Sequence, residues 1–327
     1  MNYKNLSKIF LLPLMIDSLY ADEILYNNYL NISQDSSKNA IMVGATTATA
    51  KGYSAILSNP AGLSTNANIA IYTKTTQTDK NIDKTTTIGS TQFDNQISTG
   101  ILYDSFALEY KLEDYVALGG AYGLESRYGL FSVGASYLFD ISQRADSENS
   151  KDTLNDDEYM TGDYGTIGLM WQKSFVNEDN FYAIYIGASK KMSGKSSVDR
   201  TINISIPISP EKMSFGLGLE TNIYATSVLV TFDIFKESWL SSTEVRNGTA
   251  YALKWLITEK LAIAGGISNQ TNDGNSLGDI QTFGGGIEFG FSIIQLNVSF
   301  LRREIADIDG SDYLTEDSTH IDAVIVF

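Results

Sequence analysis

Apolar and polar residues alternate strictly along many segments of this chain. In the segment "MSFGLGLETNIY" the large apolar positions are Met213, Phe215, Leu217 and Leu219. The positions between them carry serine, glycine and glutamate. A period of two residues predicts a β-strand with one apolar face and one small or polar face.

The same test predicts about fourteen strands, most of them roughly 10 to 13 residues long. A tilted strand of that length is long enough to cross a bilayer. The predicted segments are 68–77, 84–92, 104–112, 115–125, 128–139, 162–174, 181–193, 213–223, 226–236, 247–257, 260–269, 280–290, 293–303 and 317–327.

The connections between these strands differ in length at the two ends. Long polar connections follow the odd-numbered strands from the fifth onward, at 140–161, 194–212, 237–246, 270–279 and 304–316, whereas short links follow the fourth, sixth, eighth, tenth and twelfth strands. An outer-membrane barrel has long outer loops and tight periplasmic turns, and a soluble sandwich has no reason for such segregation. Two links do not fit, a tight one at Glu113–Asp114 and a long one at 93–103.

The last strand ends on an aromatic residue. Ile321, Ala323, Ile325 and Phe327 share one face. This ending resembles the signal that the barrel assembly machinery of the outer membrane reads, and we expect the strand to close the barrel against the first one. Further aromatic residues lie near the short turns and predict an inner girdle: Phe175, Phe181, Tyr182, Tyr224, Trp255, Phe291 and Phe327.

Composition supports a β-rich exported protein. The chain has 19 Tyr, 15 Phe and 27 Gly but only 4 Pro and no Cys, which excludes disulfides, a thiolate metal site and a lipid-modified cysteine. Residues 1–21 combine Lys4 and Lys8 with an apolar run and Ala21, which predicts a signal peptide. These features leave two hypotheses, a secreted or periplasmic β-protein and a bacterial outer-membrane barrel, and the loop asymmetry favours the barrel.

Net charge excludes one class of partner. The formal charge is −16 at pH 7, so the phosphates of nucleic acid would repel the chain. Alternation places seven charged residues on the inward face, and both signs occur among them: Glu109, Lys111, Lys173, Glu220, Asp233, Lys254 and Glu288.

Residues 22–66 show no strand alternation, and we expect them to plug the lumen of a barrel formed by residues 67–327. The stretch "GATTATAKGYSAILSNPAGLS" carries the motif Asn59, Pro60, Ala61, Gly62 and Leu63 directly before the first predicted strand. It resembles the N-terminal hatch of FadL-type outer-membrane transporters and their PorV-like relatives.

The resemblance implies passive uptake of small hydrophobic compounds, fatty-acid-like or aromatic, across the outer membrane of a Gram-negative bacterium. The alternative is a PorV-like anchor or shuttle for a secreted or surface-assembled partner. Lys51, Lys254 and Glu220 are the candidate ligand contacts in the lumen, and the two lysines could bind a carboxylate. Lipopolysaccharide is a further expected partner, through Arg302 and Arg303 at the outer end of a strand. The alternative is that these two arginines simply extend their side chains to the membrane rim.

Catalytic chemistry has little support. His320 is the single histidine and shares the inward face with Asp322, without a third partner for nucleophilic catalysis. The acidic stretch "DIDGSDYLTED" has its glycine at the wrong position for an EF-hand. We therefore predict no enzyme activity, no cofactor and no metal site.

Overall fold

The computed structural model describes residues 37–65, 70–78, 82–93, 96–108, 111–140, 163–177, 180–192, 211–224, 226–238, 245–272, 279–291, 294–306 and 313–326. The predicted signal peptide, residues 1–21, lies outside these ranges, as do residues 22–36 and 66 of the predicted plug and Phe327.

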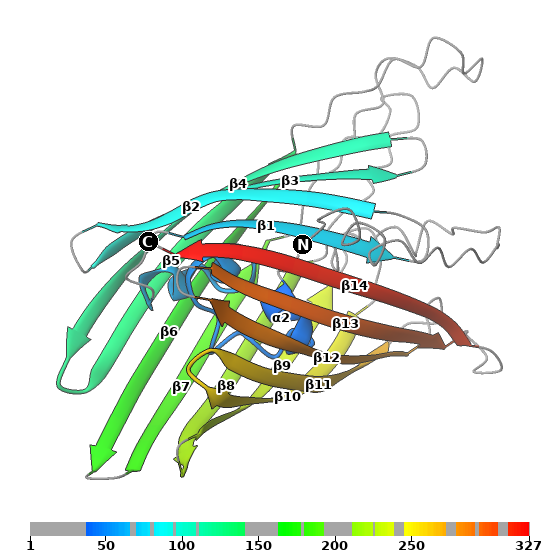
Figure 1. Ribbon diagram of the computed structural model, residues 1–327. Helices are drawn as coiled ribbons and strands as arrows, with labels where there is room; N and C mark the ends of the chain where they lie inside the picture. Colours follow the sequence, from blue (N-terminus) through cyan, green and yellow to red (C-terminus); the bar gives the residue numbers. More distant parts are fainter. Residues whose placement is uncertain are drawn as a thin grey trace, which may run out of the picture.

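Fourteen antiparallel strands form one closed barrel in which each strand pairs with its neighbours in sequence (Figure 1). The strands are β1 (Ala70–Thr78), β2 (Ile82–Phe93), β3 (Ile97–Leu108), β4 (Lys111–Ser126), β5 (Gly129–Asp140), β6 (Tyr164–Asn177), β7 (Asn180–Lys191), β8 (Glu211–Ile223), β9 (Thr226–Ser238), β10 (Val245–Thr258), β11 (Leu261–Asn272), β12 (Ile280–Phe291), β13 (Ile294–Ala306) and β14 (Tyr313–Val326). The predicted all-β antiparallel barrel is confirmed.

β14 closes the barrel against β1. Ile321, Ala323 and Ile325 pair with Thr75, Thr73 and Ile71 in a continuous register. The terminal strand is therefore hydrogen-bonded along both edges, because β13 pairs with it on the other side. A spanning sheet needs this closure, since lipid offers no partner for unpaired backbone groups.

One predicted strand was misplaced. β3 begins at Ile97 and not near 104, so residues 93–103 do not form a long connection. Ser98 and Gly100 made this segment resemble a loop, but both face inward, and a Cβ at Gly100 would lie 2.8 Å from the Ile56 side chain. The predicted turn at Glu113–Asp114 is also wrong, because both residues lie within β4.

The large apolar face points away from the lumen. On β8, Met213, Phe215, Leu217 and Leu219 are exposed, whereas the residues that alternate with them, Ser214, Gly216 and Gly218, are buried. The same arrangement holds on β9 and β10, where Ile234 and Leu253 are exposed on the outer surface. A closed barrel with this orientation is a transmembrane barrel, because a soluble protein buries its apolar face.

The predicted girdle is largely present near the short turns. Phe175, Tyr182, Tyr224, Trp255 and Phe291 are exposed on the outer surface. The prediction for Phe181 is wrong: it packs inside the barrel against a cluster of Ala48, Ala183 and Tyr185. It shares the inward parity of Ala183, so it cannot reach the lipid.

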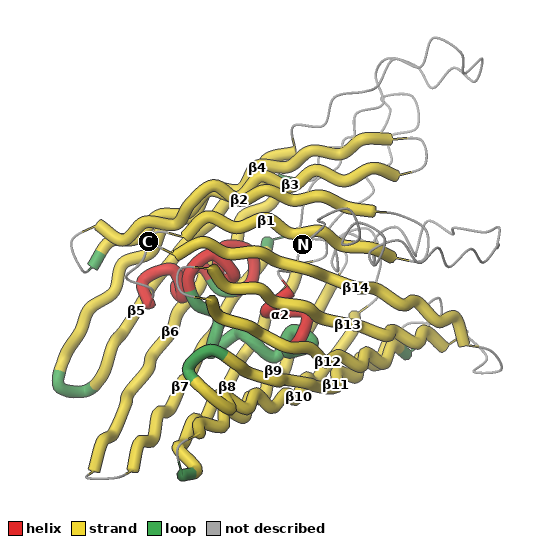
Figure 2. The backbone as a smooth tube through the Cα atoms, viewed as in Figure 1, coloured by secondary structure: helices red, strands yellow, loops and turns green. Residues whose placement is uncertain are grey.

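Residues 37–65, called the plug below, lie inside the barrel (Figure 2). They form α2 (Ser37–Ile41), η2 (Gly52–Ser54), α3 (Ala55–Ser58) and η3 (Pro60–Thr65). Ile56 and Leu63 pack with wall residues such as Leu102 and Tyr115, while Val43 packs with Phe235 and other residues of the opposite wall. Among the described residues, no helix has the length and apolar character needed to cross a membrane.

Leu217→Arg should destabilise the barrel strongly because Leu217 lies on the outer face in the middle of β8. An arginine at the bilayer midplane costs about 2–4 kcal/mol of unfolding free energy, against about 0–1 near the interface. Met213→Arg, on the same face near the strand end, is the matched control. Guanidinium unfolding in phospholipid vesicles measures both variants, and equal costs would contradict the proposed orientation.

Candidate functional site

The motif at 59–63 fastens the plug to the wall. Asn59 is fully buried, and its Nδ2 donates hydrogen bonds to the Thr47 carbonyl at 2.6 Å and to the Leu169 carbonyl of β6 at 3.2 Å. Its Oδ1 accepts a hydrogen bond from the Ala61 amide at 3.2 Å. One side chain therefore joins two parts of the plug to the barrel.

Glycines allow the backbones to approach closely at this motif. A Cβ at Gly62 would lie 2.0 Å from the Ala50 carbonyl oxygen, within the plug itself. A Cβ at Gly134 of β5 would lie 2.4 Å from the Pro60 carbonyl oxygen. No side chain fits at either place. Glycine at 62 allows the plug to fold against itself, and glycine at 134 allows the wall to contact the motif.

Polar contacts complete the attachment. The Thr47 amide donates to the Asp233 carboxylate of β9 at 2.8 Å, and Asp233 is buried. The Ser64 hydroxyl donates to Ser132 Oγ at 2.6 Å, and the Ser136 hydroxyl to the Ile56 carbonyl at 2.6 Å. The plug is thus bonded to β5, β6 and β9, on well-separated parts of the wall.

The three predicted lumen contacts lie in one region toward the short-turn end. Lys51 of the plug lies over the Tyr185 ring, with its Nζ 4.8 Å from the ring centroid. The Tyr185 hydroxyl donates to Glu220 at 2.6 Å. Lys254 bonds both carboxylate oxygens of Glu288 at 2.7 Å.

These pairings limit what the region can bind. Lys254 is already neutralised by Glu288, and Glu220 also accepts a hydrogen bond from Ser227 at 2.8 Å. Lys51 as a whole residue is exposed, yet burial of its ammonium group lowers its pKa, and the charge of Glu220 opposes that shift. A ligand carboxylate would have to compete with Glu220 for Lys51, and ligand binding by this region stays a prediction.

The seven charged residues predicted to face inward differ in where they lie. Lys173 does not face the lumen: it shares the outward parity of Leu169 and Phe175 on β6, so that prediction is wrong. A lysine near the membrane interface can face outward because its long stem reaches the headgroups. Asp233 and Glu288 are buried inside as expected, whereas Glu109 and the side chain of Lys111 lie outside what is described.

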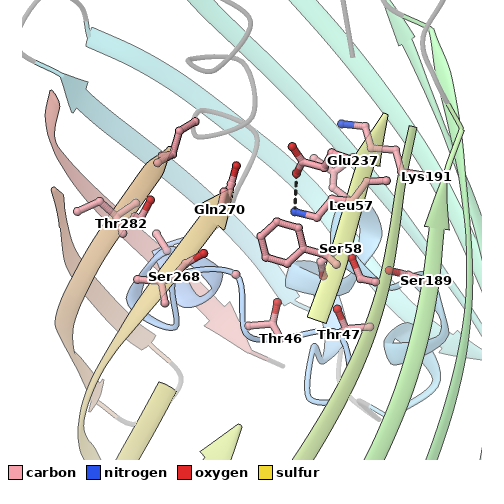
Figure 3. Close-up of a pocket in the computed structure, with 18 of the residues that line it drawn as sticks. Thr46, Thr47, Leu57, Ser58, Ser189, Lys191, Glu237, Ser268, Gln270 and Thr282 are labelled. Carbon is pink, nitrogen blue, oxygen red and sulfur yellow. Dashed lines mark ion pairs between the residues drawn. The ribbon is translucent and has the colours of Figure 1, made fainter. Parts of the chain in front are cut away.

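A cavity of about 150 Å³, called the outer vestibule, lies between the plug and the long-loop end of the barrel. Figure 3 shows Thr46 and Thr47 of the plug at one end of it and the charged Lys191 and Glu237 of the wall at the other. Sequence reasoning did not find this cavity. Its apolar lining comes from both plug and wall: Ala40, Val43, Leu57, Tyr164, Phe235, Ile280 and Leu301.

Charged groups in the outer vestibule are paired with neighbours. Lys212 forms an ion pair with Glu237 at 3.1 Å, and its Nζ lies 4.1 Å from the Phe235 ring centroid. Lys191 lies over the Tyr164 ring at 4.0 Å. Arg303 lines the cavity, whereas its neighbour Arg302 points outward and forms a bidentate pair with Asp317 at 2.9 Å.

His320 lies in a buried row on β14. Its Nε2 is 3.2 Å from Ser318 Oγ, and His320 and Asp322 are both 0% exposed. The i, i+2, i+4 spacing of serine, histidine and aspartate on one strand face is a signal that sequence reasoning missed. No substrate can reach fully buried groups, so the described geometry supports a structural role in the wall beside α2. Within the described residues no cluster of potential metal ligands occurs.

Fold and site together define a transmembrane β-barrel of the outer-membrane type with an internal plug. No protein-family model matches the sequence, and no similar curated protein was found. The fold is similar to that of the Pseudomonas putida toluene transporter TodX, with 11% identity, a TM-score of 0.46 and coverage of 89% of this chain and 96% of that one.

Two further solved structures show a comparable likeness. The outer membrane protein Omp33 of Acinetobacter baumannii has 13% identity and a TM-score of 0.46, with 80% of this chain and 98% of that one covered. OmpT, an outer membrane protein of Vibrio cholerae, has 10% identity and a TM-score of 0.39, covering 80% of this chain and 96% of that one. Identities this low do not assign the chain to a family.

Gly134→Ala should displace the plug because the new methyl group would overlap the Pro60 carbonyl. We expect increased protease cleavage within residues 37–65 of the folded, vesicle-embedded protein. Gly120→Ala is the control, since its Cβ would meet only the Ser98 carbonyl at 3.7 Å. Unchanged cleavage of Gly134→Ala, relative to that control, would show that the plug is not held as described.

Proposed function

We propose that this protein is an outer-membrane conduit for the passive uptake of small hydrophobic compounds, with fatty-acid-like or aromatic compounds as candidates. Such compounds would collect in the outer vestibule and leave past the plug. The observation that carries this proposal is the outer vestibule itself, whose floor is the plug.

The size and lining of the outer vestibule fit such a ligand. Its volume is about 150 Å³, and apolar cavities of about that size hold a benzene ring. Leu57 from the plug and Leu301 from the wall offer apolar surface, while hydroxyl groups such as those of Ser189 and Ser268 offer a few polar contacts. Small-molecule sites commonly combine apolar walls with a few oriented polar groups.

A second candidate function, an anchor or shuttle for a secreted partner, has support from the bonds between plug and wall. The plug is bonded to the wall through Asn59 and Asp233 and is in backbone contact with Gly134. A lumen filled in this way also suits a barrel that does not conduct and instead anchors or shuttles a secreted partner.

Uptake by the intact protein separates the two functions, and deletion of residues 22–58 tests whether the plug limits that uptake. For a conduit, the deletion should raise planar-bilayer conductance and change the uptake of toluene or a labelled fatty acid by whole cells, because the floor of the outer vestibule is removed. Gly120→Ala, which leaves the plug contacts intact, is the matched control. If the wild-type protein takes up neither compound above the level of cells lacking it, the conduit proposal fails.

A further inference from the structure

A patch of cationic and aromatic side chains lies on the lipid-facing surface at the short-turn end. It is formed by the β4–β5 turn, the start of β5 and the end of β6, and we call it the rim patch: Arg127, Tyr128, Phe131, Trp171, Lys173 and Phe175. The β4–β5 hairpin and the end of β6 lie at the same end of the barrel in Figure 1.

Hydrogen bonds from β6 hold the turn in place. Lys173 Nζ donates to the Arg127 carbonyl at 3.0 Å, and Trp171 Nε1 donates to the Tyr128 carbonyl at 3.0 Å. Gly129 follows the turn with φ +119°, and a Cβ there would lie 2.4 Å from the Gln172 carbonyl oxygen. The local fold therefore places the Lys173 ammonium against the backbone of Arg127.

Within the described part of the chain, the cations of the rim patch face aromatic rings and form no ion pair with a carboxylate. Arg127 lies over the Tyr128 ring at 4.6 Å, and Lys173 lies 5.3 Å from the Phe175 centroid. The ion pairs found in the described part of the chain involve neither residue. Lys190, an exposed lysine at the opposite end, is paired with Glu211 at 2.8 Å.

The surface next to the rim patch is apolar and runs toward the membrane centre. Leu124, Val133 and Leu169 are exposed there, and Phe131 pairs in register with Trp171. Phe131 and Trp171 also contact each other, with ring centroids 6.3 Å apart. Aromatic side chains mark the headgroup level of a membrane protein, and apolar surface beyond them contacts acyl chains.

We propose that the rim patch binds an anionic phospholipid of the inner leaflet, with the lipid phosphate between Arg127 and Lys173 and an acyl chain along Leu124, Phe131 and Leu169. Two cations that have no carboxylate partner among the described residues, in a chain of net charge −16, are complementary to a phosphate. A periplasmic protein is a poorer match, because the apolar surface continues into the depth of the bilayer. This inference does not depend on the proposed transport function.

Trp171 supplies a direct reporter of the lipid. In a Trp239→Phe, Trp255→Phe background it is the remaining tryptophan, because the chain has 3. The full-length protein is placed in phosphatidylcholine vesicles that contain a minor fraction of dibrominated phosphatidylglycerol or dibrominated phosphatidylcholine. The rim patch predicts stronger quenching of Trp171 fluorescence by the brominated anionic lipid, and added salt should reduce the preference.

Arg127→Gln with Lys173→Gln should reduce the preference for the anionic lipid on the order of tenfold in relative affinity. Lys190→Gln with Lys236→Gln removes two outward cations at the opposite end and should leave the preference intact. Heat-modifiable gel mobility verifies folding of each variant.

Three results would overturn the proposal. They are equal quenching by the two lipids in the background protein, a preference that survives the loss of Arg127 and Lys173, and an equal loss in the Lys190 and Lys236 control. If Arg127→Gln with Lys173→Gln does not fold, the salt titration of the background protein tests the proposal instead. A preference for the anionic lipid that does not fall with added salt would contradict a phosphate held by two exposed cations.

Discussion

Lipid provides no hydrogen-bond partner, and this constraint determines the architecture. Every backbone group that crosses the bilayer must be paired within the protein, so the sheet has to close, and β14 closes it against β1. Closure separates two surfaces. The outer one carries large apolar side chains such as Leu217 and Leu253, and the inner one carries small or polar residues.

The small inner residues leave room that the plug occupies. Gly134 and Gly168 let the Pro60 carbonyl and the Asn59 side chain touch the wall, and a Cβ at either position would overlap them. Asp233 then bonds the Thr47 amide from another side of the barrel. Steric fit and buried hydrogen bonds therefore hold the same segment in place.

Local patterns predicted much of the fold. Alternation located the strands because lipid contact selects large apolar residues at every second position. The loop lengths indicated which end of the barrel is the outer end and which is the periplasmic end. Prediction was poorest where inward residues resembled loop residues, as at the buried Ser98 and at Gly100, where the missing side chain leaves room for Ile56 of the plug. The inward assignment of Lys173 was wrong because Lys173 shares the parity of the outward residues Leu169 and Phe175, and a lysine at the rim can face outward.

Contacts within the candidate site were largely beyond prediction. Asp233 and Thr47 are 186 residues apart, and no local pattern connects them. The sequence identified Lys51, Lys254 and Glu220 individually, but their partners Tyr185 and Glu288 became evident only in the folded barrel. The outer vestibule likewise depends on how plug and wall meet, so it had no signal in the sequence.

The claim that the plug controls passage through the barrel can be tested with one disulfide. The chain has no Cys, and Ser64 of the plug lies 2.6 Å from Ser132 of the wall between hydroxyl oxygens, so Ser64→Cys with Ser132→Cys should form a single bond between them. Uptake of a labelled hydrophobic compound should fall on oxidation and return on addition of reductant. Equal uptake by the oxidised and reduced forms would contradict the claim.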